Sequence, residues 1–207
     1  MSRNPMANEA YLKEHRDGLR AAVAYFSSTN KAERELWVSR HFCQTLGLRF
    51  KASDHQRSLI EPPDVLFRDA KFEVKEILDK GRRRHGEYKT ALQRALAARE
   101  PSELVEEFIP TNATPAQLAR RIKEILRELT DHYAPAVRAQ LDILFYVNLQ
   151  ANFFVGGRMP SQRQFARFGW RSVSAYENSA SLVFFAAPNA PRFLRRRRGT
   201  FRIRLRQ

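Results

Sequence analysis

Residues 61–79 read E-P-P-D-V-L-F-R-D-A-K-F-E-V-K-E-I-L-D and predict a β-hairpin around which the rest of the fold is organised. The apolar run Val65–Phe67 and the partly alternating run Phe72–Leu78 both have the pattern of short strands. Proline cannot donate to a sheet ladder, so the first strand should begin just after Pro62-Pro63. The polar break at residues 68–70 predicts the turn between the two strands.

Alternation along this hairpin predicts a group of charged side chains on one face. Glu73 and Lys75 share a face of the second strand. If the turn is formed by Asp69-Ala70, Asp64 lies opposite Lys75 and diagonal to Glu73, about 7 Å away at the backbone. Two carboxylates this close repel each other unless a positive charge lies between them, and a hard divalent cation is the usual solution. A three-residue turn would shift the register and break this pairing, and a solvated hairpin would show the same alternation.

The same residues carry a resemblance to a known superfamily. Pro63-Asp64, then eight residues, then Glu73-Val74-Lys75 resembles the PD-(D/E)XK signature of the restriction-endonuclease-like nucleases. The whole chain also resembles a bacterial family described as "putative endonucleases". The resemblance implies an α/β fold, with a restriction-endonuclease-like core in which helices flank a small mixed sheet. It further implies Asp64 and Glu73 as ligands of Mg²⁺, which Mn²⁺ can replace, and Lys75 as the cation that places the attacking water.

The helix expected over residues 31–46 offers a third carboxylate. In the superfamily that the chain resembles, a glutamate from the first helix of the core completes the metal site. The run A-E-R-E-L at residues 32–36 then implies Glu33 as that ligand, with Glu35 as the alternate. An exposed glutamate in a first helical turn is also favoured by the helix dipole alone. A structural role for either residue therefore stays open.

Basic residues follow the E-x-K strand. Two glycines flank the cluster within residues 80–86, which predicts a flexible loop that contacts phosphates, with an ordinary exposed turn as the alternative. The resemblance implies that the next helix also holds the nucleic-acid backbone. The candidates in these two segments are Arg82, Arg83, Arg84, Lys89 and Gln93.

Charge is the most informative property of the composition. With 37 Lys and Arg against 22 Asp and Glu, the formal net charge is +15, which favours polyanions such as nucleic acid. Residues 192–207 contain eight arginines and no acidic residue, and the alternating stretch 200–206 predicts a strand with one arginine face. The alternative partner of this tail is an anionic membrane. The tail residues expected to contact phosphates are Arg195, Arg196, Arg197, Arg198, Arg202 and Arg204.

The length of 207 residues predicts one domain, and the resemblance implies that this domain is nuclease-like. We expect an N-terminal helical addition (1–29), a core (30–150) and a C-terminal addition with a basic tail (151–207). The apolar runs are too short to span a bilayer, and no apolar signal-peptide core is present, so a cytoplasmic location is expected. The single cysteine excludes an internal disulfide. Periodicity predicts helices over 8–26, 31–46, 87–99 and 115–133, and strands over 48–52, 141–149, 182–187 and 200–206.

These observations predict a metal-dependent endonuclease that hydrolyses phosphodiester bonds, with DNA favoured over RNA as its substrate. The alternative is a non-catalytic nucleic-acid-binding protein that kept the nuclease fold, because a fold alone does not determine function. Motifs for nucleotide-binding P-loops, dinucleotide binding, serine hydrolases and zinc proteases are absent. Oligomeric state is left open, with a homodimer as one option.

Overall fold

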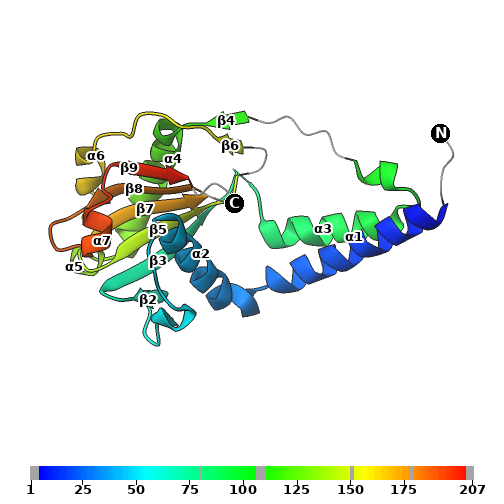
Figure 1. Cartoon of the computed structure of the whole chain (residues 1–207), viewed down its shortest axis with the longest axis horizontal. Coiled ribbons are helices and arrows are strands. Elements are labelled where there is room, and N and C mark those ends of the chain that lie inside the picture. Colours follow the sequence, from blue (N-terminus) through cyan, green and yellow to red (C-terminus); the bar gives the residue numbers. More distant parts are fainter. Residues whose placement is uncertain (1–4, 80, 106–110, 150–151, 178–179, 204–207) are drawn as a thin grey trace. The chain divides into compact units, whose positions relative to one another are not determined.

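The computed structural model describes residues 5–79, 81–105, 111–149, 152–177 and 180–203 (Figure 1). The chain forms two compact units, which we call the helical unit (within residues 1–31 and 78–109) and the sheet unit (within 32–77 and 110–207). This division differs from the one expected from the sequence in two places. Residues 78–109 group with the N-terminal helix, and residues after 150 belong to the same unit as the core.

Two long helices make up most of the helical unit. Helices α1 (Pro5–Tyr25) and α3 (Arg84–Ala97) lie side by side (Figure 1). Phe26 links them, because its ring stacks on Tyr88 with 4.9 Å between centroids. Short 3-10 helices, Ser28–Asn30 and Pro101–Leu104, complete the unit. Both predicted helices are confirmed, although α3 begins three residues earlier than expected.

The sheet unit is built on a seven-stranded mixed sheet in the order β1-β2-β3-β5-β7-β8-β9. Strands β3, β5 and β7 pair in parallel, and the outer strands pair antiparallel. The predicted α/β class with a mixed sheet is therefore confirmed, and β4 and β6 form a separate parallel pair. The strands are β1 (His55–Arg57), β2 (Val65–Phe67), β3 (Ala70–Ile77), β4 (Thr111–Ala113), β5 (Asp142–Val147), β6 (Asn152–Phe154), β7 (Ser172–Glu177), β8 (Ala180–Ala186) and β9 (Thr200–Ile203).

Helices cover both faces of this sheet. On one face, which we call the α2 face, α2 (Lys31–Thr45) packs on Phe72 through Phe42, and α7 (Arg192–Arg195) packs on Phe67 through Phe193. On the other, the α4 face, α4 (Pro115–His132) and α6 (Arg163–Ala166) contribute Ile122 and Phe165 to a second core, in which the Phe165 ring lies 5.0 Å from that of Phe184 on β8 and to which Ile77 of β3 also belongs. The short helix α5 (Pro135–Arg138) follows α4 and adds Val137 to that second core. Side chains of β3 therefore alternate between two separate hydrophobic cores.

The start of α4 follows its sequence signal closely. Thr114 accepts a hydrogen bond from the Gln117 N–H, and the Gln117 side chain accepts one from the Thr114 N–H at 2.8 Å. This reciprocal capping box satisfies two backbone donors, and Pro115 at the first helical position needs no partner for a missing N–H. The helix then runs to His132 and is followed directly by Tyr133.

The hairpin at the centre of the prediction is present, but its register differs. Phe67 pairs with Ala70 and Val65 with Phe72, so the two-residue loop is Arg68-Asp69 and the prediction of Asp69-Ala70 is wrong. Arg68 adopts a positive φ of 55°, which few residues other than glycine and asparagine favour. Because the turn moves by one residue, Asp64 shifts by two positions along β3 and no longer lies opposite Lys75.

One strand prediction is wrong, and one strand of the sheet was not predicted. No strand forms at residues 48–52; Leu48 and Phe50 instead pack as loop residues against the core of the α2 face, and the first strand begins at His55. Strand β7 was not expected, because Ser172 and Ser174 interrupt its apolar pattern although both are fully buried. The predicted strands over 141–149, 182–187 and 200–206 are confirmed as β5, β8 and β9 within the described residues.

Candidate active site

Asp64 lies beside β3, directly before the first residue of β2. Its backbone N–H donates to the Phe72 carbonyl oxygen at 3.0 Å, and its Oδ2 accepts from the Val74 N–H at 2.8 Å. The two bonds bracket Glu73. Because β2 is only three residues long, Val74 has no partner strand on this side, and the Asp64 carboxylate takes the place of a strand carbonyl. Asp64 is 5% exposed, so its carboxylate is held in a defined place next to Glu73.

Glu73 and Lys75 project from the α4 face of β3 and form an ion pair. Lys75 Nζ lies 2.6 Å from Glu73 Oε1. The Tyr133 hydroxyl donates to the same oxygen at 2.5 Å, and Lys75 Nζ lies 5.6 Å from the centre of the Tyr133 ring. The Glu73 side chain is 5% exposed, whereas that of Lys75 is 30% exposed, so solvent reaches this group through the ammonium.

These contacts perturb the acid–base properties of the group. Burial by itself would lower the pKa of Lys75, but the hydrogen bonds to Glu73 and Tyr133 outweigh it and raise that pKa above its ordinary value. Burial, followed by the hydrogen bond to Glu73, raises the pKa of Tyr133. At neutral pH the group therefore contains a charged ammonium and a protonated phenol, both directed at one carboxylate oxygen.

The third predicted ligand lies elsewhere. Glu33 is exposed and the alternate, Glu35, is 9% exposed, and both are on α2, the helix that covers the opposite face of the sheet from Glu73. Among the residues that the structure describes, no three His, Cys, Asp or Glu side chains are close enough to hold a metal ion. The structure therefore brings together Asp64, Glu73 and Lys75 but does not bring Glu33 to them.

The two carboxylates that remain still fit a magnesium ion. Mg²⁺ is usually held by one or two carboxylates, with water and substrate phosphate completing its octahedron. Glu73 belongs to β3, and Asp64 bonds to the N–H of the next residue of that strand, Val74. Both carboxylates are shielded from bulk water. A third protein carboxylate is not required for such an ion, so Asp64 and Glu73 alone are compatible with the predicted metal site.

Tyr133 is the site residue that sequence reasoning missed. It follows α4 directly and meets Glu73 across 60 positions of the chain. Its ring also packs edge-on against Trp170, with 5.3 Å between centroids. The available signal was weak, because a tyrosine at the end of an amphipathic helix matches no motif. Only the packing of α4 on the sheet brings the phenol to the carboxylate.

The predicted basic loop is partly used for structural contacts. Arg82 pairs with Glu87 at 2.6 Å and with Asp79 at 3.2 Å, which raises its pKa. Arg84 is buried, and its guanidinium lies 4.1 Å from the centre of the Phe26 ring. These two arginines stabilise the helical unit. The remaining candidates of this segment, all exposed on the helical unit, are Arg83, Lys89 and Gln93.

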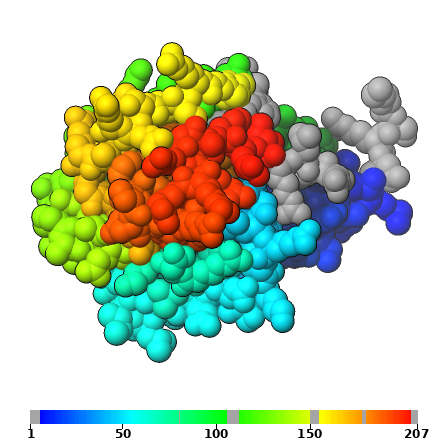
Figure 2. Space-filling model, turned by 60° about the vertical axis from the view of Figure 1, so that its left-hand side comes forward, coloured from blue at the N-terminus to red at the C-terminus, as the bar shows by residue number. Residues whose placement is uncertain are grey.

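The C-terminal arginines form a basic surface on the sheet unit, where the end of the described chain lies at the surface (Figure 2). Arg197 is half-buried, and burial followed by repulsion from Arg202 and Arg196 lowers its pKa. Arg204 lies outside the described residues. Within the described part of the chain, no helix has the length and apolarity that crossing a bilayer requires. The exposed arginines are Arg192, Arg195, Arg196, Arg198 and Arg202.

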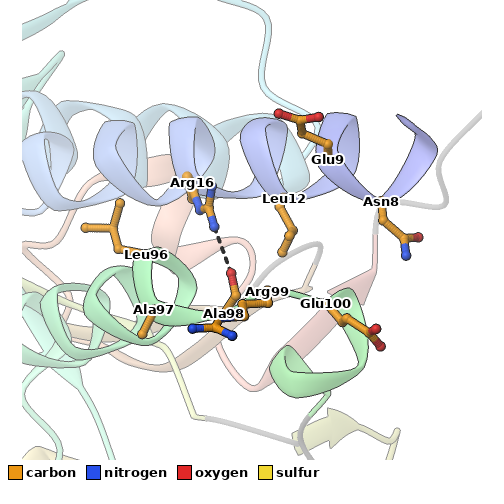
Figure 3. Close-up of a pocket in the computed structure, with 9 residues that line it drawn as sticks. All are labelled: Asn8, Glu9, Leu12, Arg16, Leu96, Ala97, Ala98, Arg99 and Glu100. Carbon is orange, nitrogen blue, oxygen red and sulfur yellow. Dashed lines mark hydrogen bonds between the residues drawn. The ribbon is translucent and has the colours of Figure 1, made fainter. Parts of the chain in front are cut away.

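The helical unit also contains an open pocket of about 620 Å³ between α1 and α3 (Figure 3). Arg16 reaches from α1 into it and donates to the carbonyl oxygens of Ala95 and Ala98 at 2.8 and 2.9 Å. These carbonyls belong to the last turn of α3 and its cap, which have no partners within the helix. Arg16 thus closes the end of α3, and we assign the pocket no chemistry.

Comparison with known proteins places the chain in a family. Residues 7–205 match the model of the family described as "Putative endonuclease, protein of unknown function (DUF1780)". The chain belongs to this family. A solved structure from Pseudomonas aeruginosa strain PAO1, described as a protein of unknown function of the monooxygenase superfamily, is 27% identical over 94% of each chain, with a TM-score of 0.66. No curated protein matches the chain. The PD-(D/E)XK signature itself stays a prediction.

Proposed function

We propose that the protein is a magnesium-dependent endonuclease whose active site consists of Asp64, Glu73 and Lys75. One observation supports the proposal: Asp64 bonds to the N–H of Val74 next to Glu73, and Glu73 pairs with Lys75, with both carboxylates buried and the ammonium partly open to solvent. The family description and the net charge of +15 support a nucleic-acid substrate. Exposed arginines of residues 192–202 supply the positive surface that a phosphate backbone requires.

Each residue has a distinct task in this proposal. When bound at Asp64 and Glu73, Mg²⁺ would polarise a phosphodiester oxygen and lower the pKa of a coordinated water. Lys75 places a fixed positive charge where negative charge develops in the transition state. Tyr133 acts as a positioning residue, because its hydroxyl fixes the Glu73 carboxylate. The raised pKa of Lys75 keeps that ammonium charged throughout the physiological range.

A second candidate is a nucleic-acid-binding protein that does not cut. It is favoured by the hydrogen bonds that the two carboxylates already make, with Asp64 bonded to the Val74 N–H and Glu73 to Lys75 and Tyr133. Such internal pairing also stabilises folded proteins that have no catalytic role. The two candidates share the basic surface and differ in turnover.

Incubation of the intact protein with nucleic acid separates the two candidates. We expect cleavage of single-stranded DNA, duplex DNA or RNA in Mg²⁺ or Mn²⁺, and none after chelation, because the carboxylates need the cation to activate water. Products resolved on a denaturing gel report the cutting. Binding of these substrates without cleavage in either ion would exclude the nuclease and favour the second candidate.

A further inference from the structure

Four aromatic side chains lie together on the α2 face of the sheet, the opposite face from Glu73. Trp37 and His41 come from α2, Tyr146 from β5 and Tyr176 from β7. The centroid of the Trp37 ring is 4.2 Å from that of His41, 5.8 Å from Tyr146 and 5.9 Å from Tyr176. We call these four residues the Trp37 cluster.

Trp37 is exposed where its neighbours on the helix are not. It is 36% exposed, whereas Leu36 and Val38 are 8% and 2% exposed and belong to the hydrophobic core. Packing therefore uses about two-thirds of the Trp37 surface and leaves the remaining third open to a ligand.

The cluster holds the exposed ring in a fixed orientation. Tyr146 and Tyr176 meet Trp37 edge-on, at interplanar angles of 73° and 68°, and His41 lies tilted against it at 31°. His41 is itself fixed, because its Nδ1 lies 2.9 Å from the Trp37 carbonyl oxygen. A ring oriented in advance loses little entropy when another flat ring stacks on it.

The position in the sheet is one where ligands commonly bind. Tyr146 and Tyr176 are paired in register and are the last residues but one of β5 and β7. These strands are parallel, so the cluster lies at their carboxyl ends. In open α/β sheets, ligands bind outside the carboxyl ends of the parallel strands.

Positive charge lies just beyond the C-terminal end of the same helix. Arg202 Nη1 lies 3.5 Å from the position that a Cβ on Gly47 would occupy, just beyond α2. Ten residues separate Gly47 from Trp37, which corresponds to about 15 Å along a helix. Aromatic rings that stack bases, next to cations that pair with phosphates, are the usual means of binding single strands. In a duplex, the faces of the bases are already stacked on one another.

We propose that Trp37 stacks on an unpaired base of single-stranded nucleic acid. The phosphates of that strand contact Arg202 and the other exposed C-terminal arginines. This inference rests on the proposed function, since it assumes a nucleic-acid substrate, and it adds a preference for unpaired nucleotides. It does not depend on cleavage, because the cluster lies on the opposite face from Lys75.

Fluorescence provides a direct test, because the chain contains only two tryptophans and the other, Trp170, is 1% exposed. The intact protein is titrated, in chelator, with a dye-labelled single strand or with the duplex of the same sequence. We expect the single strand alone to quench tryptophan emission. Trp37→Ala should remove the quenching and weaken single-strand binding about tenfold, while Trp37→Phe retains most of the affinity because a ring remains. Duplex binding should stay unchanged.

A matched control is Tyr25→Ala, which removes a ring that is 38% exposed from the helical unit and should change neither measurement. Equal single-strand affinity of the wild type and Trp37→Ala would overturn the stacking inference and leave the proposed function standing. If the wild type bound neither oligonucleotide, the nucleic-acid substrate itself would be wrong. Circular dichroism shows that each variant is folded before it is titrated.

Discussion

Replacing Lys75 by alanine should lower the rate of metal-dependent cleavage at least about a hundredfold, the effect typical of removing a charge that stabilises the transition state. Lys75 is the only residue of the Asp64–Glu73–Lys75 group that carries positive charge, and its side chain is 30% exposed to solvent. Nucleic-acid affinity should change by less than about twofold, because one of many positive charges is lost. Single-turnover cleavage and equilibrium binding measure the two effects separately.

Lys71→Ala is a matched control for this variant. Lys71 lies on the same strand, four residues before Lys75, and is exposed. We expect cleavage by Lys71→Ala to equal that of the wild type. Lys75→Met keeps the aliphatic stem and guards against loss of folding in the alanine variant. Cleavage by a folded Lys75→Met protein at the wild-type rate would remove Lys75 from the active site.

Replacing Arg171 by leucine should lower the free energy of unfolding by about 3 to 5 kcal/mol, the usual effect of breaking a buried ion pair. Asp142 is fully buried, and Arg171 donates to both of its carboxylate oxygens. Arg171 also donates to the Asp69 carbonyl oxygen at 3.0 Å, which ties the hairpin turn to the start of β7. The loss is a large part of the total stability of a typical domain. Urea denaturation followed by circular dichroism measures it.

The pH dependence of that loss identifies its cause. Burial already raises the pKa of Asp142, against the lowering effect of Arg171. Without the guanidinium that pKa rises further, so the folded variant takes up a proton and the destabilisation should be smaller at pH 5 than at pH 8.

The double variant Asp142→Leu with Arg171→Leu should be more stable at pH 8 than Arg171→Leu alone. As a control, the exposed Arg192→Ala should change stability by less than about 0.5 kcal/mol. A loss at Arg171 equally small would contradict this account.

Much of the fold could be predicted from local pattern. The amphipathic periodicity and the capping residue Thr114 give α4, and the continuous apolar run gives β5. Strand β7 could not be found in this way, because Ser172 and Ser174 are fully buried for reasons that only the tertiary structure supplies. Ser172, for example, donates to Asp142 at 2.8 Å. A pattern of buried and exposed positions fails where a polar side chain finds its partner on another strand.

The candidate site was predictable only where it depends on local sequence. Asp64, Glu73 and Lys75 are close in sequence, so the hairpin alone brings them together. Their exact register depends on the positive φ of Arg68, for which the sequence carries no glycine or asparagine signal. The prediction of Glu33 as a ligand depended on which face of the sheet α2 would cover. Finding Tyr133 would have required knowing where α4 ends against the sheet. Both are properties of packing rather than of local sequence.

Divalent-ion binding by a protein that cannot cut tests the central claim most directly. Calorimetry with Mg²⁺ on Lys75→Ala, in the presence of bound oligonucleotide, avoids loss of the substrate during the titration. The account predicts that this protein binds Mg²⁺ and that adding Asp64→Asn abolishes the binding, because a neutral amide cannot replace a carboxylate ligand of a hard cation. Equal Mg²⁺ affinity with and without Asp64→Asn, or no binding by either protein, would contradict it.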